Sequence, residues 1–273
     1  MHYICKLLRE VTTIGKHFIM TKDEQILTEY LDDYGLDIFS REQIAEIENL
    51  SYRQVEIALR GLTRRLYIKL IDRGKYCKQD FSDGFVIGNF IVKNGGVAYW
   101  SAMNFHGLTE QIPNVIFVQT SQRKKNKNIF NVRYKFVQVK KNKLIGYKTE
   151  GYGNHQFNIT DIEKTIVDCF DLPKYAGGYP EIIKAFNIAK LSAIKLVKYC
   201  KAINNLSIVK RLAYLTELLN KPKMDYFLKY ALSVRNEKYV LFEHDGEKTG
   251  RTNRKWRLVL NMNDDEIMNM AKS

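Results

Sequence analysis

The chain has 273 residues, enough for two domains that each bury a core of their own. Apolar residues make up 45% of the sequence and aromatic residues 12%, a composition that excludes a disordered chain. Lys and Arg number 44 against 30 Asp and Glu, so the net charge is +14. A surplus of this size favours a polyanionic partner such as nucleic acid, although a basic protein without such a partner would have the same composition.

The sequence predicts a soluble protein of the cytoplasm. It has no run of eighteen apolar residues, and no apolar stretch of signal-peptide length near its start, so residues 1–20 are expected to form a short N-terminal extension. The four cysteines, Cys5, Cys77, Cys169 and Cys200, are widely spaced and form no CxxC pair. Free thiols are therefore expected instead of disulfides or a zinc site, and no cofactor or bound metal is predicted.

Charge is strongly polarised near the N-terminus. Residues 21–50 contain nine acidic residues, opposed only by Lys22 and Arg41, whereas residues 51–78 contain eight basic residues, opposed by Glu56 and Asp72. A domain of this kind could turn its basic face toward phosphates while its acidic face disfavours wrong orientations. Three solvated helices with chance charge patterning would give the same counts.

Three capping boxes divide this N-terminal part. Thr21–Glu24, Ser40–Gln43 and Ser51–Gln54 each place a Ser or Thr three residues before a Glu or Gln, which predicts helices over residues 21–34, 40–47 and 51–69. A long helix, a short helix, a tight turn and a second long helix are typical of a helix-turn-helix. We therefore predict a winged helix-turn-helix DNA-binding domain over residues 21–80.

The third predicted helix has two distinct faces. Its apolar stripe comprises Val55, Ala58, Leu59, Leu62 and Leu66. The opposite face carries Arg53, Ile57, Arg60 and Arg64. Arg53 and Arg60 could each hold a guanine edge with two hydrogen bonds, and Ile57 could pack on a thymine methyl or on a neighbouring protein surface.

A basic hairpin follows this helix. Leu70–Ile71 and Tyr76–Cys77 read as short strands on either side of a turn at Gly74, with Arg73 and Lys75 at the tip. This hairpin would be the wing, placed for the sugar–phosphate backbone. The candidate DNA-contacting residues are Tyr52, Arg53, Gln54, Ile57, Arg60, Arg64, Arg73 and Lys75. A winged helix that docks on protein in place of DNA would carry the same elements.

The larger C-terminal part, residues 82–273, reads as a mixed α+β domain that begins after a linker near residues 78–82. Gly95 and Gly96 separate two helix-like segments, the second over residues 97–105. Strands are expected at residues 115–118, 130–139, 144–147 and 156–159, with a closing hairpin of residues 239–242 and 255–260. Helices are expected at residues 160–170, 179–186, 192–202, 206–219 and 224–233.

A basic stretch lies among the predicted strands. Residues 123–148 contain ten basic residues and no acidic one. The candidate basic surface comprises Arg123, Lys124, Lys125, Lys127, Lys140, Lys141 and Lys143. It could extend a DNA contact or bind RNA, and as an alternative it is simply a solvated loop tip.

Four carboxylates near one helix, Asp161, Glu163, Asp168 and Asp171, invite a nuclease interpretation. However, Asp161 and Glu163 stand at a helix start, where acidic residues are favoured for structural reasons. No Lys follows an Asp or Glu at the two-residue spacing of restriction-type nucleases, and the sequence has no phosphate-binding loop and no HExxH. We therefore predict no enzymatic activity, no catalytic residues and no metal ligands.

Several stretches of the C-terminal part resemble the AbiEi antitoxin family. They are Ser101–Ala102, His106–Asn114 (HGLTEQIPN), Thr160–Asp168 (TDIEKTIVD), Pro173–Gly178 (PKYAGG), Lys210–Tyr214 with Glu217, and Lys255–Leu258 with Asn261. The HGLTEQIPN and PKYAGG runs are the more distinctive ones. Ala213 departs from the family pattern, in which a glycine is expected.

The resemblance implies a repressor of its own operon that is also the antitoxin of a type IV toxin–antitoxin system. The implied partners are double-stranded operator DNA and an AbiEii-like nucleotidyltransferase toxin encoded beside it. Two alternatives stay open. The chain could be a toxin- or RNA-binding module whose winged helix docks protein, or an accessory protein of a nuclease.

Overall fold

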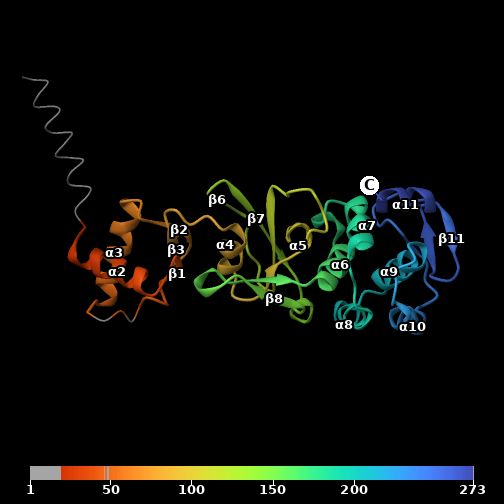
Figure 1. Ribbon diagram of the computed structural model, residues 1–273, viewed down its shortest axis with the longest axis horizontal. Coiled ribbons are helices and arrows are strands. Elements are labelled where there is room, and N and C mark those ends of the chain that lie inside the picture. The colour runs from red at the N-terminus through yellow and green to blue at the C-terminus, as the bar shows by residue number, and fades with distance from the viewer. Residues whose placement is uncertain (1–19, 46, 48, 273) are drawn as a thin grey trace, which may run out of the picture. The chain divides into compact units, whose positions relative to one another are not determined.

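The computed structural model describes residues 20–45, 47 and 49–272 (Figure 1). All but the last residue of the expected N-terminal extension lies outside this range. The chain is a mixed α+β protein, as predicted, with helices and three β-sheets in the described part. None of the described helices has both the length and the apolar character that spanning a membrane requires.

The chain packs as two compact units. Unit 1 holds the described residues up to Ile87 together with Gly151–Gln156, here called the inserted segment. Unit 2 holds Gly88–Glu150 and the described residues from Phe157 onward. The boundary expected near residue 80 thus lies a few residues before the observed division, and the inserted segment had been expected in the second domain.

Unit 1 is built from two helices and a small sheet. Its elements are α2 (Lys22–Asp33), β1 (Ile38–Ser40), α3 (Tyr52–Arg64), β2 (Ile68–Asp72) and β3 (Lys75–Lys78). The three strands are antiparallel in the order β1-β3-β2. Leu27 and Leu31 of α2 pack with Val55, Leu59 and Leu62 of α3 in a core that excludes water. Both helices begin with the predicted capping boxes.

The short helix expected over residues 40–47 is not formed, because residues 41–45 adopt turns instead. Ser40 and Gln43 do make the reciprocal contacts of a capping box, at 2.7 and 3.3 Å. Ser40, however, already belongs to β1, and the Arg41 N–H donates to the Gly74 carbonyl. This contact ties the chain to the hairpin where a helix would have to start. Residues 46 and 48 lie outside the described part.

The third predicted helix is shorter than expected, since α3 ends at Arg64 and not near residue 69. Leu66 adopts a positive φ of 59° and is 65% exposed, so it lies outside the apolar stripe to which it had been assigned. The Tyr67 N–H donates back to the Leu62 carbonyl, which closes the helix end and directs the chain into β2.

The inserted segment completes the edge of β1. The Ile38 N–H donates to Asn154 Oδ1 at 2.8 Å, and His155 Nε2 lies 2.7 Å from Asp37 Oδ2. Burial raises the pKa of Asp37, but hydrogen bonds from Lys78 and His155 outweigh it, and the net pKa is lowered. The segment therefore satisfies a strand edge and a carboxylate of unit 1.

Unit 2 contains a six-stranded mixed sheet in the order β6-β7-β5-β4-β9-β8. The strands are β4 (Gly96–Val97), β5 (Val115–Thr120), β6 (Lys127–Ile129), β7 (Val132–Gln138), β8 (Tyr147–Glu150) and β9 (Phe157–Thr160). The pairs β5–β7 and β4–β9 are parallel, and the others are antiparallel. The strand expected over residues 130–139 is formed as β7, but Phe130 and Asn131 take positive φ angles and form the turn that joins it to β6, a strand that was not expected.

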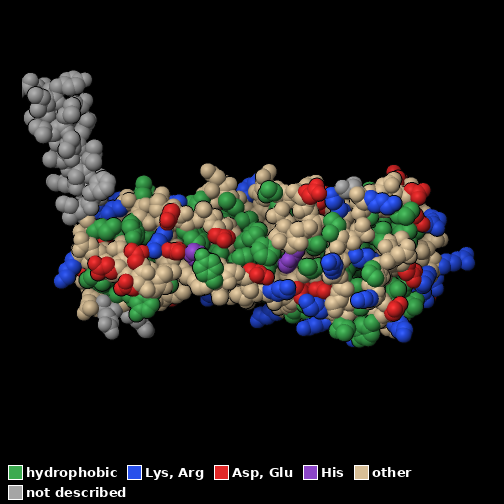
Figure 2. Space-filling view, in the orientation of Figure 1, with side chains coloured by type: hydrophobic (Ala, Val, Ile, Leu, Met, Phe, Trp, Pro, Cys, Tyr) green, Lys and Arg blue, Asp and Glu red, His purple; other side chains and the backbone are tan. Residues whose placement is uncertain are grey.

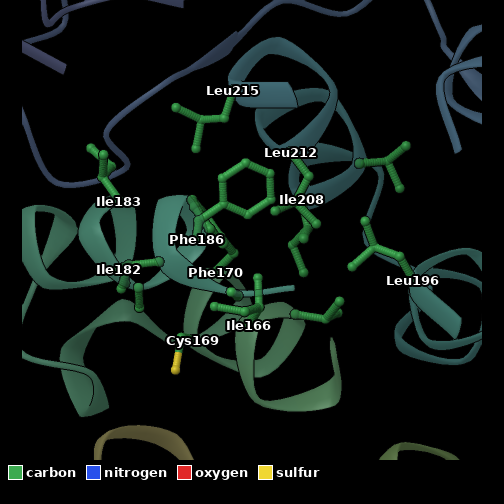
Figure 3. Close-up of a cluster of buried hydrophobic side chains, with 14 of the residues drawn as sticks. Ile166, Cys169, Phe170, Ile182, Ile183, Phe186, Leu196, Ile208, Leu212 and Leu215 are labelled. Carbon is green, nitrogen blue, oxygen red and sulfur yellow. The ribbon is translucent and has the colours of Figure 1, made fainter. Parts of the chain in front are cut away.

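The helices of unit 2 follow the sheet for the most part. They are α5 (Tyr99–Phe105), α6 (Ile162–Asp171), α7 (Tyr179–Ile188), α8 (Ala193–Ile203), α9 (Leu206–Leu218), α10 (Asp225–Val234) and α11 (Asp264–Lys272), after α4 (Gly84–Ile91), which spans the division between the units. Leucine, isoleucine and phenylalanine side chains from α6, α7, α8 and α9 meet in one core (Figure 3).

A three-stranded sheet closes unit 2. Its strands are β10 (Val240–Leu241), β11 (Arg251–Asn253) and β12 (Leu258–Leu260), in the order β10-β12-β11. The hairpin expected between residues 239–242 and 255–260 is not formed, since β10 pairs with β12 in parallel and β11 is the antiparallel partner. Cys77, Cys169 and Cys200 are buried free thiols, as expected.

Candidate nucleic-acid interface

The solvent side of α3 carries the residues that the sequence singled out. Arg53, Ile57, Arg60 and Arg64 are all exposed, and half of the Ile57 side chain is accessible. Arg60 donates from Nε to the Glu56 carbonyl at 3.3 Å. The opposite face of α3 fills the core, so the helix offers a row of guanidinium groups around one exposed aliphatic side chain.

A hollow of about 540 Å³ lies against the second half of α3. The start of α2 forms one wall through Thr21 and Glu24. The wall from α3 and its C-cap comprises Ile57, Arg60, Gly61, Arg64 and Arg65. Arg60, Arg64 and Arg65 thus line one concave surface together with the Glu24 carboxylate.

The floor of this hollow is a buried carboxylate that sequence reasoning did not single out. Glu24 Oε2 accepts from the Thr21 N–H at 2.7 Å and from Arg65 Nε at 3.2 Å. The capping box was visible in the sequence, but the contact to Arg65 spans 41 positions and leaves no local signal. Because Arg65 is bonded to Glu24, it is less available to a ligand than Arg60 or Arg64.

Gly61 is required where α3 passes this carboxylate. A Cβ at position 61 would lie 1.8 Å from Glu24 Oε1, and the hydrogen bonds from Thr21 and Arg65 hold that carboxylate in place. We expect Gly61→Ala to destabilise unit 1 by about 1–3 kcal/mol, as overpacking does. The free energy of unfolding from urea titration checks this.

The double variant Glu24→Ala/Gly61→Ala is the matched control, because it removes the clashing atoms. Its loss should be smaller than the sum of the losses of the two single variants. Additive losses would show that Gly61 does not need the space beside Glu24.

The N-terminal end of α3 is only partly available to a ligand. Gln54 accepts from the Ser51 N–H and donates to Asp23, so its amide is engaged within the protein. Tyr52 is exposed, but the Arg41 guanidinium carbon lies over the Tyr52 ring, 5.6 Å from its centre. The Tyr52 hydroxyl lies 3.3 Å from Glu56 Oε1. Tyr52 and Gln54, both predicted to contact DNA, thus also help to order the start of the helix.

The hairpin of β2 and β3 carries two further candidate DNA-contacting residues, Arg73 and Lys75. Arg73 is exposed in the turn, where Gly74 has a φ of 67° that only glycine adopts at little cost. Lys75 is partly buried in β3, opposite Ser40 of β1 and Asp72 of β2. Arg73 is therefore the more accessible cation of the hairpin. Acidic side chains are grouped over α2 on the face seen in Figure 2.

The predicted basic surface of unit 2 comprises two separate segments, residues 123–127 before β7 and residues 140–143 after it. Residues 123–127 run back along β7, where Lys124 Nζ lies 5.8 Å from the centre of the Phe136 ring. Lys141 and Lys143 lie in a short 3₁₀ helix beyond the end of β7, and Lys143 pairs with Asp171 at 2.5 Å. Arg123, Lys125, Lys140 and Lys141 are exposed. Figure 2 shows further Lys and Arg side chains over α8 and α10.

The carboxylates of Asp161 and Glu163, near the start of α6, are engaged in contacts within the protein. Asp161 caps α6 and accepts from Tyr199 Oη at 2.7 Å, and Glu163 accepts from the Ser192 N–H at 2.9 Å. Lys195 bridges these two acids, at 3.0 and 3.4 Å. Within the described residues, no three His, Cys, Asp or Glu side chains converge as a metal site would require.

Asp168 belongs to a polar network buried inside unit 2. Its carboxylate accepts hydrogen bonds from Lys164 Nζ at 2.5 Å and from Gln119 Nε2 at 2.8 Å. The Tyr147 hydroxyl donates to Gln119 Oε1. The side chains of Lys164 and Asp168 are almost completely excluded from water. Burial raises the pKa of Asp168, and Lys164 opposes that shift.

Comparison with known proteins identifies a shared fold. The chain is similar to the crystal structure of RV2827C protein from Mycobacterium tuberculosis, with a TM-score of 0.64 and 12% sequence identity. The similarity covers 93% of this chain and 96% of the other. No protein-family model matches the chain. No curated protein matches it in sequence. At 12% identity the likeness concerns architecture alone.

Proposed function

We propose that the protein is a sequence-specific repressor that binds double-stranded operator DNA through a winged helix-turn-helix in unit 1. The observation that carries the proposal is the line of exposed arginines on α3, beside an exposed basic hairpin. In this arrangement α3 enters the major groove and the hairpin of β2 and β3 is the wing. The short helix expected between α2 and α3 is not part of this arrangement, because residues 41–45 form turns.

Each candidate residue has a role that follows from its position. Arg53 and Arg60 read guanine edges, and Ile57 between them packs on a thymine methyl. Arg64 and Arg73 contact phosphates, which position the protein without reading sequence.

Loss of a base-reading arginine should weaken specific binding. We expect Arg53→Ala or Arg60→Ala to raise the dissociation constant for operator DNA by the equivalent of roughly 1–3 kcal/mol, with little change for unrelated DNA. Fluorescence anisotropy with the DNA upstream of the gene and with a scrambled duplex measures both. Lys229→Ala is the matched control, because Lys229 is an exposed cation of unit 2. Unchanged operator affinity in both folded arginine variants would refute the assignment of α3 as the recognition helix.

We further propose that the protein is the antitoxin of a type IV system with an AbiEii-like nucleotidyltransferase toxin. This second role is supported by the resemblance of the HGLTEQIPN and PKYAGG runs, both of which lie in unit 2. The proposal assigns no catalytic chemistry to this chain. Repression and protection are then carried by different units.

Repression and protection should therefore separate in the full-length chain. The double variant Arg53→Ala/Arg60→Ala should lose repression of its own promoter but still restore the growth of cells that express the toxin gene. A promoter reporter and growth curves under toxin induction measure the two activities in one strain. Should the folded variant lose both activities, protection would depend on α3, and the assignment of separate roles would be wrong.

A further inference from the structure

Arg211 of α9 is a buried cation without a carboxylate partner in the described part of the chain. Arg211 is only 4% exposed, and its Nε and Nη2 atoms donate to the Leu241 carbonyl at 3.2 and 3.0 Å. Burial lowers the pKa of Arg211, but a guanidinium keeps its proton at any physiological pH. A buried charge of this kind is costly unless something neutralises it.

Arg211 lines a hollow of about 380 Å³ in unit 2. Lys174, from the 3₁₀ helix after α6, lies on the same hollow and contacts the Tyr175 ring at 5.1 Å. The start of α9 borders it through Asn205 and Ser207, and the first turn of a helix carries a partial positive charge. Two cations and the start of a helix, where Asn205 Oδ1 accepts from the Ser207 N–H, therefore border one concavity.

Two acidic residues, Asp171 and Asp245, also line this hollow. Asp171 is held by Lys143 and by Asn205 Nδ2, at 2.5 and 3.1 Å. Asp245, on the exposed rim, lies 2.6 Å from His244 Nδ1 and attracts the Arg211 guanidinium. Lys143, Lys174 and Arg211 thus outnumber the two carboxylates, and an anion is the ligand that would balance the remaining positive charge.

A second hollow of about 480 Å³ adjoins the first and shares Asp171, Leu172 and Asn205 with it. Its lining adds the polar side chains of Gln138, Asn142 and Lys140. Amides and a carboxylate can bind hydroxyl groups and a base edge, and the two volumes together fall in the range of small-molecule sites.

We propose that unit 2 binds a phosphorylated small molecule of nucleotide size, with its phosphate on Arg211, Lys174 and the start of α9. The remainder of the ligand lies in the adjoining hollow near Asn142. This site is independent of the DNA contact proposed for α3, since it lies entirely within unit 2.

The test is a titration of the full-length protein with inorganic phosphate and with AMP, followed by NMR of the backbone amides of Asn205 and Ser207. Inorganic phosphate should shift these amides with a dissociation constant on the order of 1 mM. AMP should bind roughly tenfold more tightly, because the adjoining hollow adds contacts. Glutamate, a carboxylate probe, should bind more weakly than phosphate.

Variants connect the signal to the two cations. Lys174→Gln should weaken phosphate binding roughly fivefold, and Arg211→Gln should abolish it, whereas Lys229→Gln and Arg53→Ala should leave it unchanged. If Arg211→Gln does not fold, Lys174→Gln alone decides, because Lys174 is exposed. The proposal is overturned if phosphate at about 20 mM shifts neither amide, if Lys174→Gln binds as the unchanged chain does, or if glutamate binds as tightly as phosphate.

Discussion

Operator affinity is expected to fall by roughly 10³-fold or more when the salt concentration rises from about 50 to about 200 mM. In the proposed complex the hairpin, α3 and the basic loop at residues 123–127 would make on the order of 6–10 phosphate contacts, and each would release condensed counterions from the DNA. The slope of log affinity against log salt, measured by fluorescence anisotropy, gives the number of contacts directly.

Single variants should change this slope in a graded way. Arg64→Ala and Arg73→Ala should each reduce it by about one contact, because both residues are assigned to phosphates. Arg53→Ala, assigned to a base, should lower affinity and reduce the slope less. A nearly flat salt dependence of the unchanged chain would contradict DNA binding by unit 1 and favour a winged helix that docks on protein.

The buried pair of Lys164 and Asp168 should show the largest stability effect in the chain. Lys164→Met leaves the Asp168 carboxylate without its cation in a site closed to water, and we expect a loss of roughly 3–5 kcal/mol in the free energy of unfolding. The loss should shrink as the pH falls. Burial raises the pKa of Asp168, so protonation becomes easier and removes the unpaired charge of the folded variant.

Two further variants make this result interpretable. Lys164→Met/Asp168→Asn removes both charges but keeps an acceptor for Gln119, and it should recover much of the loss. Lys195→Met makes the same substitution at a lysine whose side chain is 44% exposed, and it should cost less than about 1 kcal/mol. Equal losses of unfolding free energy for Lys164→Met and Lys195→Met in urea titrations would contradict the claim that burial makes the Lys164–Asp168 pair important for stability.

Local sequence signals predicted most elements of the fold correctly. The capping boxes before α2 and α3 and the apolar stripe of α3 depend on residues within four positions of one another, and the structure forms them. The helix α11 was missed, although Asn263 and Glu266 form the same reciprocal cap that marked the other helices. That signal was present in the sequence and could have been used.

Other elements depend on contacts that no local pattern records. β1 is only three residues long, and it is a strand because β3 pairs with it and Asn154 completes its edge. The turns at residues 41–45 follow from the same pairing, which competed with the helix that a capping box predicted. At the candidate site, exposure of the arginines followed from the helix period, whereas the Glu24–Arg65 contact and the Arg211 hollow required the folded chain.

The inserted segment has a consequence for the order in which the protein is made. A ribosome releases the chain from its N-terminus at about 5–20 residues per second, and domains fold as their residues emerge. α2, α3 and the hairpin emerge early, but Asn154 and His155 follow only after β4, β5, β6, β7 and β8 of unit 2. The edge of β1 therefore stays open, and the Asp37 carboxylate has only Lys78 as a partner, until the unit 2 sheet is nearly synthesised, which delays completion of unit 1 during translation.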